Sequence, residues 1–320
     1  MLYVFSLLFI LAVIIRKSYY SIFSNKVFKS EKRIISVGNI TTGGSGKTPF
    51  SIFLAKYLIS QNHNIAIVLR GYKSNIENQN TLVNSENLLK AGDEAALYFN
   101  NLPNIPICIG KDRVKSIKYL EENFPNLETI IMDDAYQHLK VKQDIKICVF
   151  NSNYPIGNGF CLPAGILREP FNSLKYGNVF IINGYINDLP EKFINKLKKF
   201  NKPIIYSEYK ISDIKDFQGN TIDINSLKDK SLMLMSGIGS PKSFEKTIEK
   251  HGLSFREHLI LNDHFDYTTS FLAKQKNLFN KHDFILITEK DYSKLKSLKL
   301  QISFLVIYVK LDIDTNLIFL

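Results

Sequence analysis

Three glycines, a lysine and a threonine gather in one short stretch directly after an apolar run, and this arrangement constrains the fold most. Residues 34–37 have the β-branched character of a buried strand, and residues 47–60 repeat apolar side chains near helical spacing. Gly43, Gly44 and Gly46 can adopt positive φ and let the backbone approach an anion closely. The stretch therefore predicts a strand, a glycine turn and a helix whose N-terminal amides form an anion cradle.

This order of elements is typical of a P-loop, which binds nucleotide phosphates. In the full pattern G-x-x-x-x-G-K-[ST] the first glycine would stand at Thr41, so the match is incomplete. Lys47 would reach the outer phosphates, and the Thr48 hydroxyl would ligate Mg²⁺. A glycine turn that merely precedes Lys-Thr is the simpler alternative, but it leaves the strand and the helix unexplained. Phosphate contacts are expected from Thr41, Thr42, Gly43, Gly44, Ser45, Gly46, Lys47 and Thr48.

The composition bounds the partners of the chain. It has 320 residues and a formal net charge of +11. This charge suits an anionic partner such as an anionic lipid, a nucleic acid or a nucleotide, although part of the excess reflects a general richness in Lys. The basic residues are scattered rather than gathered in a stripe, so we expect no nucleic-acid partner. Cys108, Cys148 and Cys161 lack metal-ligand spacing, and the two in apolar runs indicate reduced core residues of a cytosolic compartment. We expect a monomer.

The N-terminal segment is apolar over residues 2–15, with Ser6 as its one polar interruption, and Arg16 and Lys17 follow. A cleaved signal peptide would need a basic n-region and a small-residue cleavage site, which are missing here, whereas a buried core helix fits the length. A spanning helix needs about 20 apolar residues. We favour an uncleaved anchor that barely spans or lies in one leaflet, with Arg16 and Lys17 at the anionic cytoplasmic face.

A later apolar run ends in two adjacent carboxylates, Asp133 and Asp134. Parallel α/β sheets place their chemistry at the carboxyl ends of strands, and Mg²⁺ takes oxygen ligands. A helix cap or a turn is the simpler interpretation of such a pair, but the glycine turn in the same predicted sheet favours metal binding. A long Gly- and Pro-rich loop over residues 151–170 carries Arg168 and Glu169, and loops of this length are often functional.

The alternation of apolar runs with helical patterns predicts an α/β fold. We expect a P-loop NTPase-like, mostly parallel sheet flanked by helices, with a smaller C-terminal α/β domain and an N-terminal membrane-associated helix. Residues 213–230 are polar with few large apolar side chains, which indicates a linker. The predicted parts are therefore the N-terminal helix (1–20), the P-loop domain (21–212), the linker (213–230) and the smaller domain (231–320).

The combination of motifs is more specific than the P-loop alone. In order along the chain, after the apolar segment, stand Val37-Gly-Asn-Ile-Thr-Thr-Gly-Gly-Ser-Gly-Lys-Thr-Pro49, Arg70-Gly-Tyr72, Gly92-Asp-Glu94, Asp133-Asp-Ala-Tyr-Gln-His138, Leu162-Pro-Ala-Gly-Ile-Leu-Arg-Glu-Pro170, Asp263-His264 and Thr288-Glu-Lys-Asp291. The chain resembles, over essentially its whole length, the tetraacyldisaccharide 4'-kinase family. It departs from the usual residues of that family at Ala95, Ala135, Gln143 and Ile166, which bear on loop shape more than on activity.

The resemblance implies a reaction and a location. ATP, with Mg²⁺, would phosphorylate the 4'-hydroxyl of a tetraacyldisaccharide 1-phosphate and give lipid IVA in lipid A biosynthesis. The family acts at the cytoplasmic face of the bacterial inner membrane, so the implied partners are this lipid A precursor and an anionic membrane surface. The apolar N-terminus and the basic chain agree with that location.

The resemblance also implies roles outside the P-loop. Asp93 and His264 would form the general base, since a carboxylate orients an imidazole and raises its basicity. They fall in different predicted domains, so the pair would assemble when the domains close. Catalytic roles are expected for Asp93, His264 and Lys47, metal binding for Thr48, Asp133, Asp134 and Glu169, and substrate contacts for Arg70, Tyr72, Arg113 and Arg168.

Two further classes of protein fit the sequence less well. A metal-insertion GTPase or ATPase would need clusters of Cys and His and would not need an apolar N-terminus. A membrane scaffold with a degenerate P-loop would not need to keep Lys47, Thr48 and the acids downstream.

Overall fold

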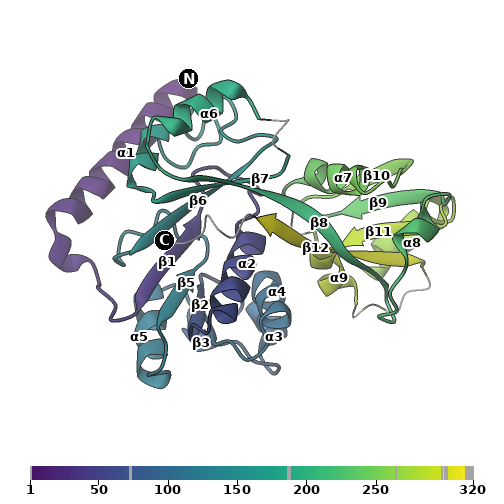
Figure 1. The fold of residues 1–320 in the computed structure, drawn as a ribbon, viewed down its shortest axis with the longest axis horizontal. Coiled ribbons are helices and arrows are strands. Elements are labelled where there is room, and N and C mark those ends of the chain that lie inside the picture. The colour runs from purple at the N-terminus through teal and green to yellow at the C-terminus, as the bar shows by residue number, and fades with distance from the viewer. Residues whose placement is uncertain are drawn as a thin grey trace. The chain divides into compact units, whose positions relative to one another are not determined.

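The structure is a computed structural model, and it describes residues 2–71, 74–185, 189–263, 265–296, 298 and 302–313. The chain forms two compact units, which meet in the sequence between Ser207 and Glu208, inside strand β8 (Ile204–Asp216). Strand β8 belongs to the strand order of both units (Figure 1), and each unit has its own hydrophobic core.

The first unit contains a sheet of the order β8-β7-β6-β1-β5-β2-β4-β3. Its pairings are parallel, except that β3 runs antiparallel to β4. The chain builds β2, β4 and β5 on one side of β1 and then crosses to β6 on the other side, so the sheet order reverses at β1. Such a switch point is where parallel sheets bind ligands, beyond the carboxyl ends of the strands. The strands are β1 (Arg33–Gly38), β2 (Ile65–Leu69), β3 (Thr81–Leu82), β4 (Ile107–Ile109), β5 (Thr129–Met132), β6 (Ile145–Asn151) and β7 (Val179–Asn183).

Helices cover both faces of this sheet. Ile34 of β1 belongs to the core cluster that contains Ile117 and Leu120 of α5, whereas the next residue, Ile35, faces Phe50 of α2 on the other side. This alternation follows from the period of two along a strand. The helices of the unit, apart from the N-terminal one, are η1 (Ser24–Lys26), α2 (Lys47–Ser60), α3 (Leu88–Ala91), α4 (Asp93–Asn101), α5 (Arg113–Asn123), η2 (Phe171–Tyr176) and α6 (Glu191–Lys198).

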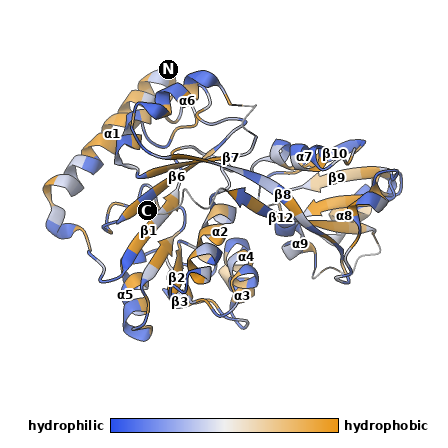
Figure 2. Cartoon of the chain, in the orientation of Figure 1, coloured by the Kyte–Doolittle hydropathy of each residue, from blue (hydrophilic) through white to orange (hydrophobic). Residues whose placement is uncertain are grey.

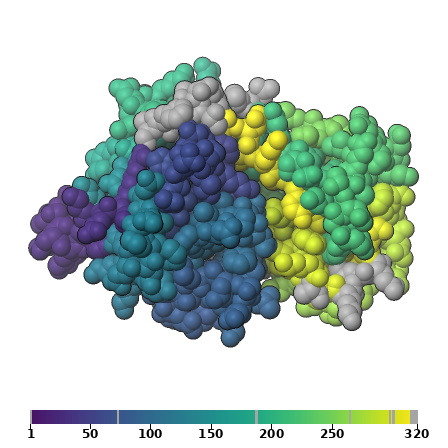
Figure 3. Space-filling model, turned by 60° about the horizontal axis from the view of Figure 1, so that its bottom comes forward, coloured from purple at the N-terminus to yellow at the C-terminus, as the bar shows by residue number. Residues whose placement is uncertain are grey.

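The N-terminal helix α1 (Leu2–Ile22) is long and apolar enough to cross a membrane, with a mean hydropathy of 1.8. One stripe of it packs on the first unit: Phe9 and Ile10 contact the core cluster that contains Phe150 and Phe180, and the buried Ser6 donates to the Cys161 carbonyl. Most of its other side chains over residues 2–15 are apolar and exposed (Figure 2; purple in Figure 3). The exposed side chains are Leu2, Tyr3, Val4, Phe5, Leu7, Leu8, Leu11, Ile14, Ile15, Tyr19 and Ile22.

The second unit is a smaller sheet of the order β10-β9-β11-β12-β8, with β10, β9, β11 and β12 pairing in parallel. Side chains of β9 alternate between two cores: Leu232 and Leu234 pack on one face, Met233 and Met235 on the other. The elements that follow β8 are η4 (Ile224–Leu227), β9 (Leu232–Ser236), α7 (Pro241–Lys250), β10 (Glu257–Ile260), α8 (Thr269–Phe279), β11 (Phe284–Thr288), α9 (Glu289–Leu295) and β12 (Phe304–Ile313).

The predicted fold class is confirmed, but the predicted linker is not where the units divide. The polar stretch 213–230 belongs to the second unit, because β8 continues to Asp216 and a 3-10 helix follows. Ile214 and Leu227 are buried in the core of that unit. Ile222 and Ile224 also pack against this core, so a few spaced apolar residues fix a stretch whose average composition is polar.

Gly38, at the end of β1, has no room for a side chain. A Cβ atom there would lie 2.6 Å from both the backbone N and the Cβ of Tyr136. We expect Gly38→Ala to lower the free energy of unfolding by about 1–3 kcal/mol, the usual cost of overpacking a core. Denaturant unfolding measures this, with Leu89→Ala, at a site 94% exposed, as the control that should stay near wild type. Equal midpoints for Gly38→Ala and wild type would contradict the crowding.

Candidate functional site

The glycine turn joins the carboxyl end of β1 to the first residue of α2, at the switch point of the sheet. Gly43 and Gly46 have φ of 95° and 81°, a region that favours glycine. Among the residues that the structure describes, the amides of Gly43, Gly44, Ser45 and Gly46 donate to no protein acceptor. Unused donors of this kind at a helix N-terminus form an anion-binding site.

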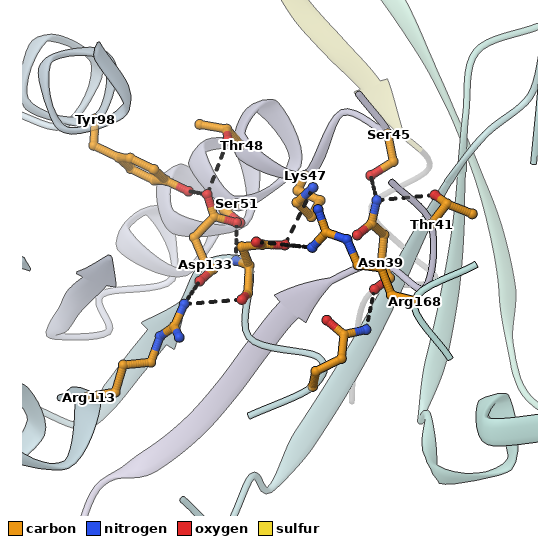
Figure 4. Close-up of polar contacts among 12 residues, drawn as sticks. Asn39, Thr41, Ser45, Lys47, Thr48, Ser51, Tyr98, Arg113, Asp133 and Arg168 are labelled. Carbon is orange, nitrogen blue, oxygen red and sulfur yellow. Dashed lines mark hydrogen bonds and ion pairs between the residues drawn. The ribbon is translucent and has the colours of Figure 1, made fainter. Parts of the chain in front are cut away.

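Polar side chains fix the shape of this turn (Figure 4). The buried Asn39 amide donates to the hydroxyls of Thr41, at 3.3 Å, and Ser45, at 3.0 Å. Gln137, which follows β5, donates its amide to the Asn39 carbonyl at 2.7 Å. The turn is therefore held from inside before any ligand arrives.

Two further asparagines tie the turn to neighbouring strands. Asn151 at the end of β6 donates to the Gly44 carbonyl at 3.1 Å, and Asn183 at the end of β7 donates to the Ser45 carbonyl at 3.4 Å. The two residues are register partners in the parallel sheet. Neither asparagine was predicted from the sequence. The available signal was a polar amide at the carboxyl end of each of two otherwise apolar strands.

Asp133, directly after β5, is a buried carboxylate that accepts three hydroxyl hydrogen bonds. Thr48 donates to Oδ2 at 3.1 Å, Ser51 to Oδ1 at 3.3 Å, and Tyr98 to Oδ2 at 2.8 Å (Figure 4). Burial raises the pKa of Asp133, while the Tyr98 hydrogen bond and the charge of Lys47 oppose this. The pKa of Tyr98 is also raised, by burial and by the neighbouring Asp133. Tyr98 therefore stays a neutral donor.

Asp134 is the more accessible of the two acids and faces cations. It has φ of 44°, and its amide donates to Asp133 Oδ1 at 2.8 Å. Its carboxylate lies 3.5 Å from Lys47 Nζ and 3.2 Å from the Arg168 guanidinium. Burial alone would raise the pKa of Asp134, but Lys47, Arg168 and Arg113 outweigh it and lower the pKa. Asp134 is therefore the counter-ion of the cations beside the turn.

Arg113 holds the turn formed by the two acids from behind. It is buried at the start of α5, and its guanidinium donates to the backbone carbonyls of Asp133 at 2.9 Å and Asp134 at 3.1 Å. The expectation that Arg113 contacts the substrate stays a prediction; in this structure its Nη2 group is bonded to the backbone inside the unit. Arg168, in turn, is paired with Asp134 rather than open to a headgroup.

Glu169 does not lie with the other expected metal ligands. Its carboxylate is buried and binds Lys17 of α1 at 2.5 Å. Within the described part of the chain, no three His, Cys, Asp or Glu side chains gather in a group that would hold a metal. A buried carboxylate without a cation is costly, and Lys17 of α1 supplies the cation for Glu169.

The remaining expected residues are spread more widely. Asp93 is in the first turn of α4, the helix that brings Tyr98 to Asp133, and the exposed Arg70 follows β2. Tyr72 and His264 lie outside the described residues. The site that the structure assembles therefore consists of the glycine turn, Asp133, Asp134 and the cations around them.

The oxygen atoms of this site suit Mg²⁺. Thr48 Oγ1 lies 3.1 Å from Asp133 Oδ2 beside the unused amides of the turn, and Asp134 is the next residue. Hydroxyl and carboxylate oxygens are the ligands that Mg²⁺ takes next to nucleotide phosphates. The same arrangement of turn, lysine, hydroxyl and acid recurs in enzymes that transfer phosphoryl groups.

Known proteins are similar to this chain over most of its length. Residues 1–318 match the family model of tetraacyldisaccharide-1-P 4'-kinase. The tetraacyldisaccharide 4'-kinase of Halothermothrix orenii is 33% identical over 89% of this chain and 79% of its own, and that of Francisella tularensis subsp. novicida is 34% identical over 77% and 76%. A crystal structure of LpxK from Aquifex aeolicus in complex with ATP superimposes with a TM-score of 0.74 at 25% identity, covering 98% of this chain and 94% of that one. The resemblance inferred from the motifs is confirmed.

His138, close to the acids in sequence, makes the stability of the folded protein depend on pH. Burial, with Arg113 and other nearby cations, lowers the pKa of His138 to about 3, so the folded protein keeps it neutral. In the unfolded chain it takes up a proton below about pH 6.5. The stability that neutral His138 permits is therefore present above pH 6.5 and is lost as the pH falls toward 3.

We expect the free energy of unfolding to fall by about 1 kcal/mol more in wild type than in His138→Gln between pH 7.5 and pH 5.5. Denaturant unfolding at the two pH values measures the difference. His63→Gln is the control, because His63 is a partly exposed histidine that lies beside Glu128, and it should keep the wild-type dependence. Parallel pH profiles for wild type and His138→Gln would show that His138 is not held neutral by the fold.

Proposed function

Because this chain belongs to the tetraacyldisaccharide 4'-kinase family, we propose that it transfers the γ-phosphoryl group of ATP to the 4'-hydroxyl of a tetraacyldisaccharide 1-phosphate. The product would be lipid IVA, in lipid A biosynthesis. The observation that carries the proposal is the set of unused amides in the glycine turn, with Lys47 and Thr48 at its end and Asp133 against Thr48. Phosphoryl transfer needs positioning and charge neutralisation more than covalent chemistry, and these groups offer both.

The triphosphate would lie in the glycine turn. The amides of residues 43–46 would hold its oxygens, and the α2 N-terminus would favour its negative charge. Lys47 and Arg168 now neutralise Asp134, and they would turn toward the phosphates when ATP arrives. Thr41 and Thr42 would help to shape the turn. The Thr42 amide already donates to the Ile166 carbonyl at 2.8 Å.

Thr48, Asp133 and Asp134 would hold Mg²⁺, which would neutralise charge on the phosphates. Thr48 and Asp133 are already in hydrogen-bond contact, so Asp133 is the acid that we place nearest the ion. Glu169 would not bind the ion in this arrangement, because its carboxylate binds Lys17; it would instead help to hold the loop that carries Arg168.

The proton of the attacking hydroxyl needs an acceptor. We assign this role to Asp93 and His264, as the family resemblance implies. The carboxylate would orient the imidazole, and the neutral imidazole would accept the proton. Of the substrate contacts expected, Arg70 stays a candidate because it is exposed after β2, and Tyr72 follows it in the sequence.

We further propose that α1 lies in the cytoplasmic surface of a bacterial inner membrane rather than across it. Ser6, Phe9 and Ile10 face the first unit, and a spanning helix would have to give up these contacts. The exposed apolar side chains of the other faces suit burial to the depth of the acyl boundary. The net charge of +11 favours anionic lipid, and the protein would act there as a monomer without nucleic acid.

The decisive experiment incubates the purified protein with γ-labelled ATP, Mg²⁺ and the tetraacyldisaccharide 1-phosphate. Label should appear in a bisphosphorylated lipid, and Lys47→Ala should slow the reaction by at least about 100-fold, as removal of one charge-stabilising group does. Lys56→Ala, a change at an exposed lysine of the same helix, is the matched control and should keep wild-type turnover. Absence of labelled lipid with wild type would refute the proposed reaction.

The assignment of the base has its own test. His264→Ala should lower kcat by about 10²–10⁴-fold, the usual contribution of general base catalysis, while the dissociation constant for ATP changes little. Calorimetric titration with ATP and steady-state kinetics separate the two effects. A large loss of ATP affinity would place His264 at the nucleotide instead, and His63→Ala controls for the loss of an imidazole elsewhere.

A further inference from the structure

A lysine–glutamate ion pair joins the apolar helix α1 to the loop that leads into η2. Lys17 Nζ lies 2.5 Å from Glu169 Oε2, and the side chains of the two residues are 20% and 4% exposed. Lys17 also lies 5.2 Å from the centre of the Tyr176 ring. The pair is thus largely buried, mainly on the Glu169 side, and an ion pair there is screened less than one on the surface.

The same helix holds the other end of this loop. The Ser6 hydroxyl donates to the Cys161 carbonyl at 2.8 Å, and Ser6 itself is buried. Ser6 and Lys17 are eleven residues apart, about 16 Å along the helix axis. The loop of residues 161–169 is therefore fastened to α1 at its first and its last residue.

This loop forms one wall of the glycine turn. The Thr42 amide donates to the Ile166 carbonyl at 2.8 Å, and the Arg168 amide donates to the Ile40 carbonyl at 2.7 Å. Thr41 and Leu167 form a β-bridge between these two hydrogen bonds. The backbone on either side of the bridge fixes the position of the Arg168 guanidinium, which contacts both oxygens of Asp134 at 3.2 and 3.3 Å.

We propose that Lys17 is a positioning residue for the nucleotide site, and that α1 sets the geometry of the phosphate-binding turn through Glu169 and the loop 161–169. The inference rests on the proposed function, because the ligand whose binding it predicts is ATP. Lys17 touches no part of the expected nucleotide; it acts by holding Glu169, and with it Arg168, in place. The helix that offers an apolar surface to the membrane is then also a part of the catalytic scaffold.

Lys17 holds Glu169 in place through its positive charge. Glu169 is buried, and removing its partner leaves a carboxylate without compensation inside the unit. Lys146 is another cation whose charge acts on Glu169, but it lies over the Tyr136 ring, 4.9 Å from its centre, and burial lowers its pKa. Without Lys17, Glu169 is expected to move toward water and to draw the neighbouring Arg168 away from Asp134.

The test uses Lys17→Met, which keeps the length of the side chain and removes the charge, in the full-length protein. Calorimetric titration with ATP and Mg²⁺, without lipid acceptor, should show a dissociation constant raised at least about five-fold, the lower end of measured couplings between linked sites. Recovery with anionic vesicles should stay at the wild-type level, since the apolar surface is intact. Lys17→Arg should restore most of the affinity for ATP.

Arg16→Met is the matched control, because Arg16 is the adjacent basic residue on the same helix and is exposed. It should leave the affinity for ATP at the wild-type value. A second control is the double variant: Lys17→Met should add little further loss in a Glu169→Gln background, because the pair is already broken there. Additive losses would mean that Lys17 does not act through Glu169 and would overturn the proposal.

Wild-type affinity for ATP in a folded Lys17→Met protein would overturn the proposal and leave the proposed function intact. Failure of the wild type itself to bind ATP would overturn the proposed function and the inference together. If Lys17→Met does not fold, Ser6→Ala carries the test, since it loosens only the far end of the loop. A raised dissociation constant for ATP in Ser6→Ala supports the link to α1, and an unchanged one refutes it.

Discussion

The structure of the first unit depends on one buried carboxylate. Asp133 lies at the end of a strand with almost no exposure, and burying a charge without partners is costly. Three hydroxyls resolve this: two on α2 and one on α4. Satisfying Asp133 therefore docks both helices against β5 at the same point and brings Thr48, at the start of α2, next to an acid. The arrangement that lowers the cost of a buried charge is also the one that would form the proposed Mg²⁺ site.

The second acid balances a different set of charges. Lys47 and Arg168 approach the Asp134 carboxylate, and Arg113 holds its backbone. Without a ligand, Asp134 keeps these cations from repelling one another; with a polyanion in the turn, they would have a stronger partner. The unused amides of the turn lie beside them, so the site is built for several negative charges at once.

Much of this was predictable from the sequence, because strong local patterns decided it. The bounds of α2 agree with the helical spacing of apolar residues over 47–60 that predicts this helix. The glycine turn and the acids at the end of β5 followed from motif order. Three features did not follow: the linker that proved to be part of a core, the asparagines at the ends of β6 and β7, and the partner of Glu169. Each depends on which residues meet in space, and neither propensity nor spacing records such contacts.

The N-terminal helix shows why composition alone was ambiguous. An apolar run of this length fits an anchor and a core helix equally well, and α1 has properties of both. The two residues that interrupt or end the run decide the matter. Ser6 and Lys17 would be costly in lipid, and both are turned to partners on the first unit, whereas Leu7, Leu8, Leu11, Ile14 and Ile15 between them are exposed. The polar residues thus mark the face that packs on the protein and leave an apolar face for a bilayer. If this apolar face binds a bilayer, as we propose, the contacts of Ser6 and Lys17 would hold the first unit, and with it the phosphate-binding turn, close to the lipid surface.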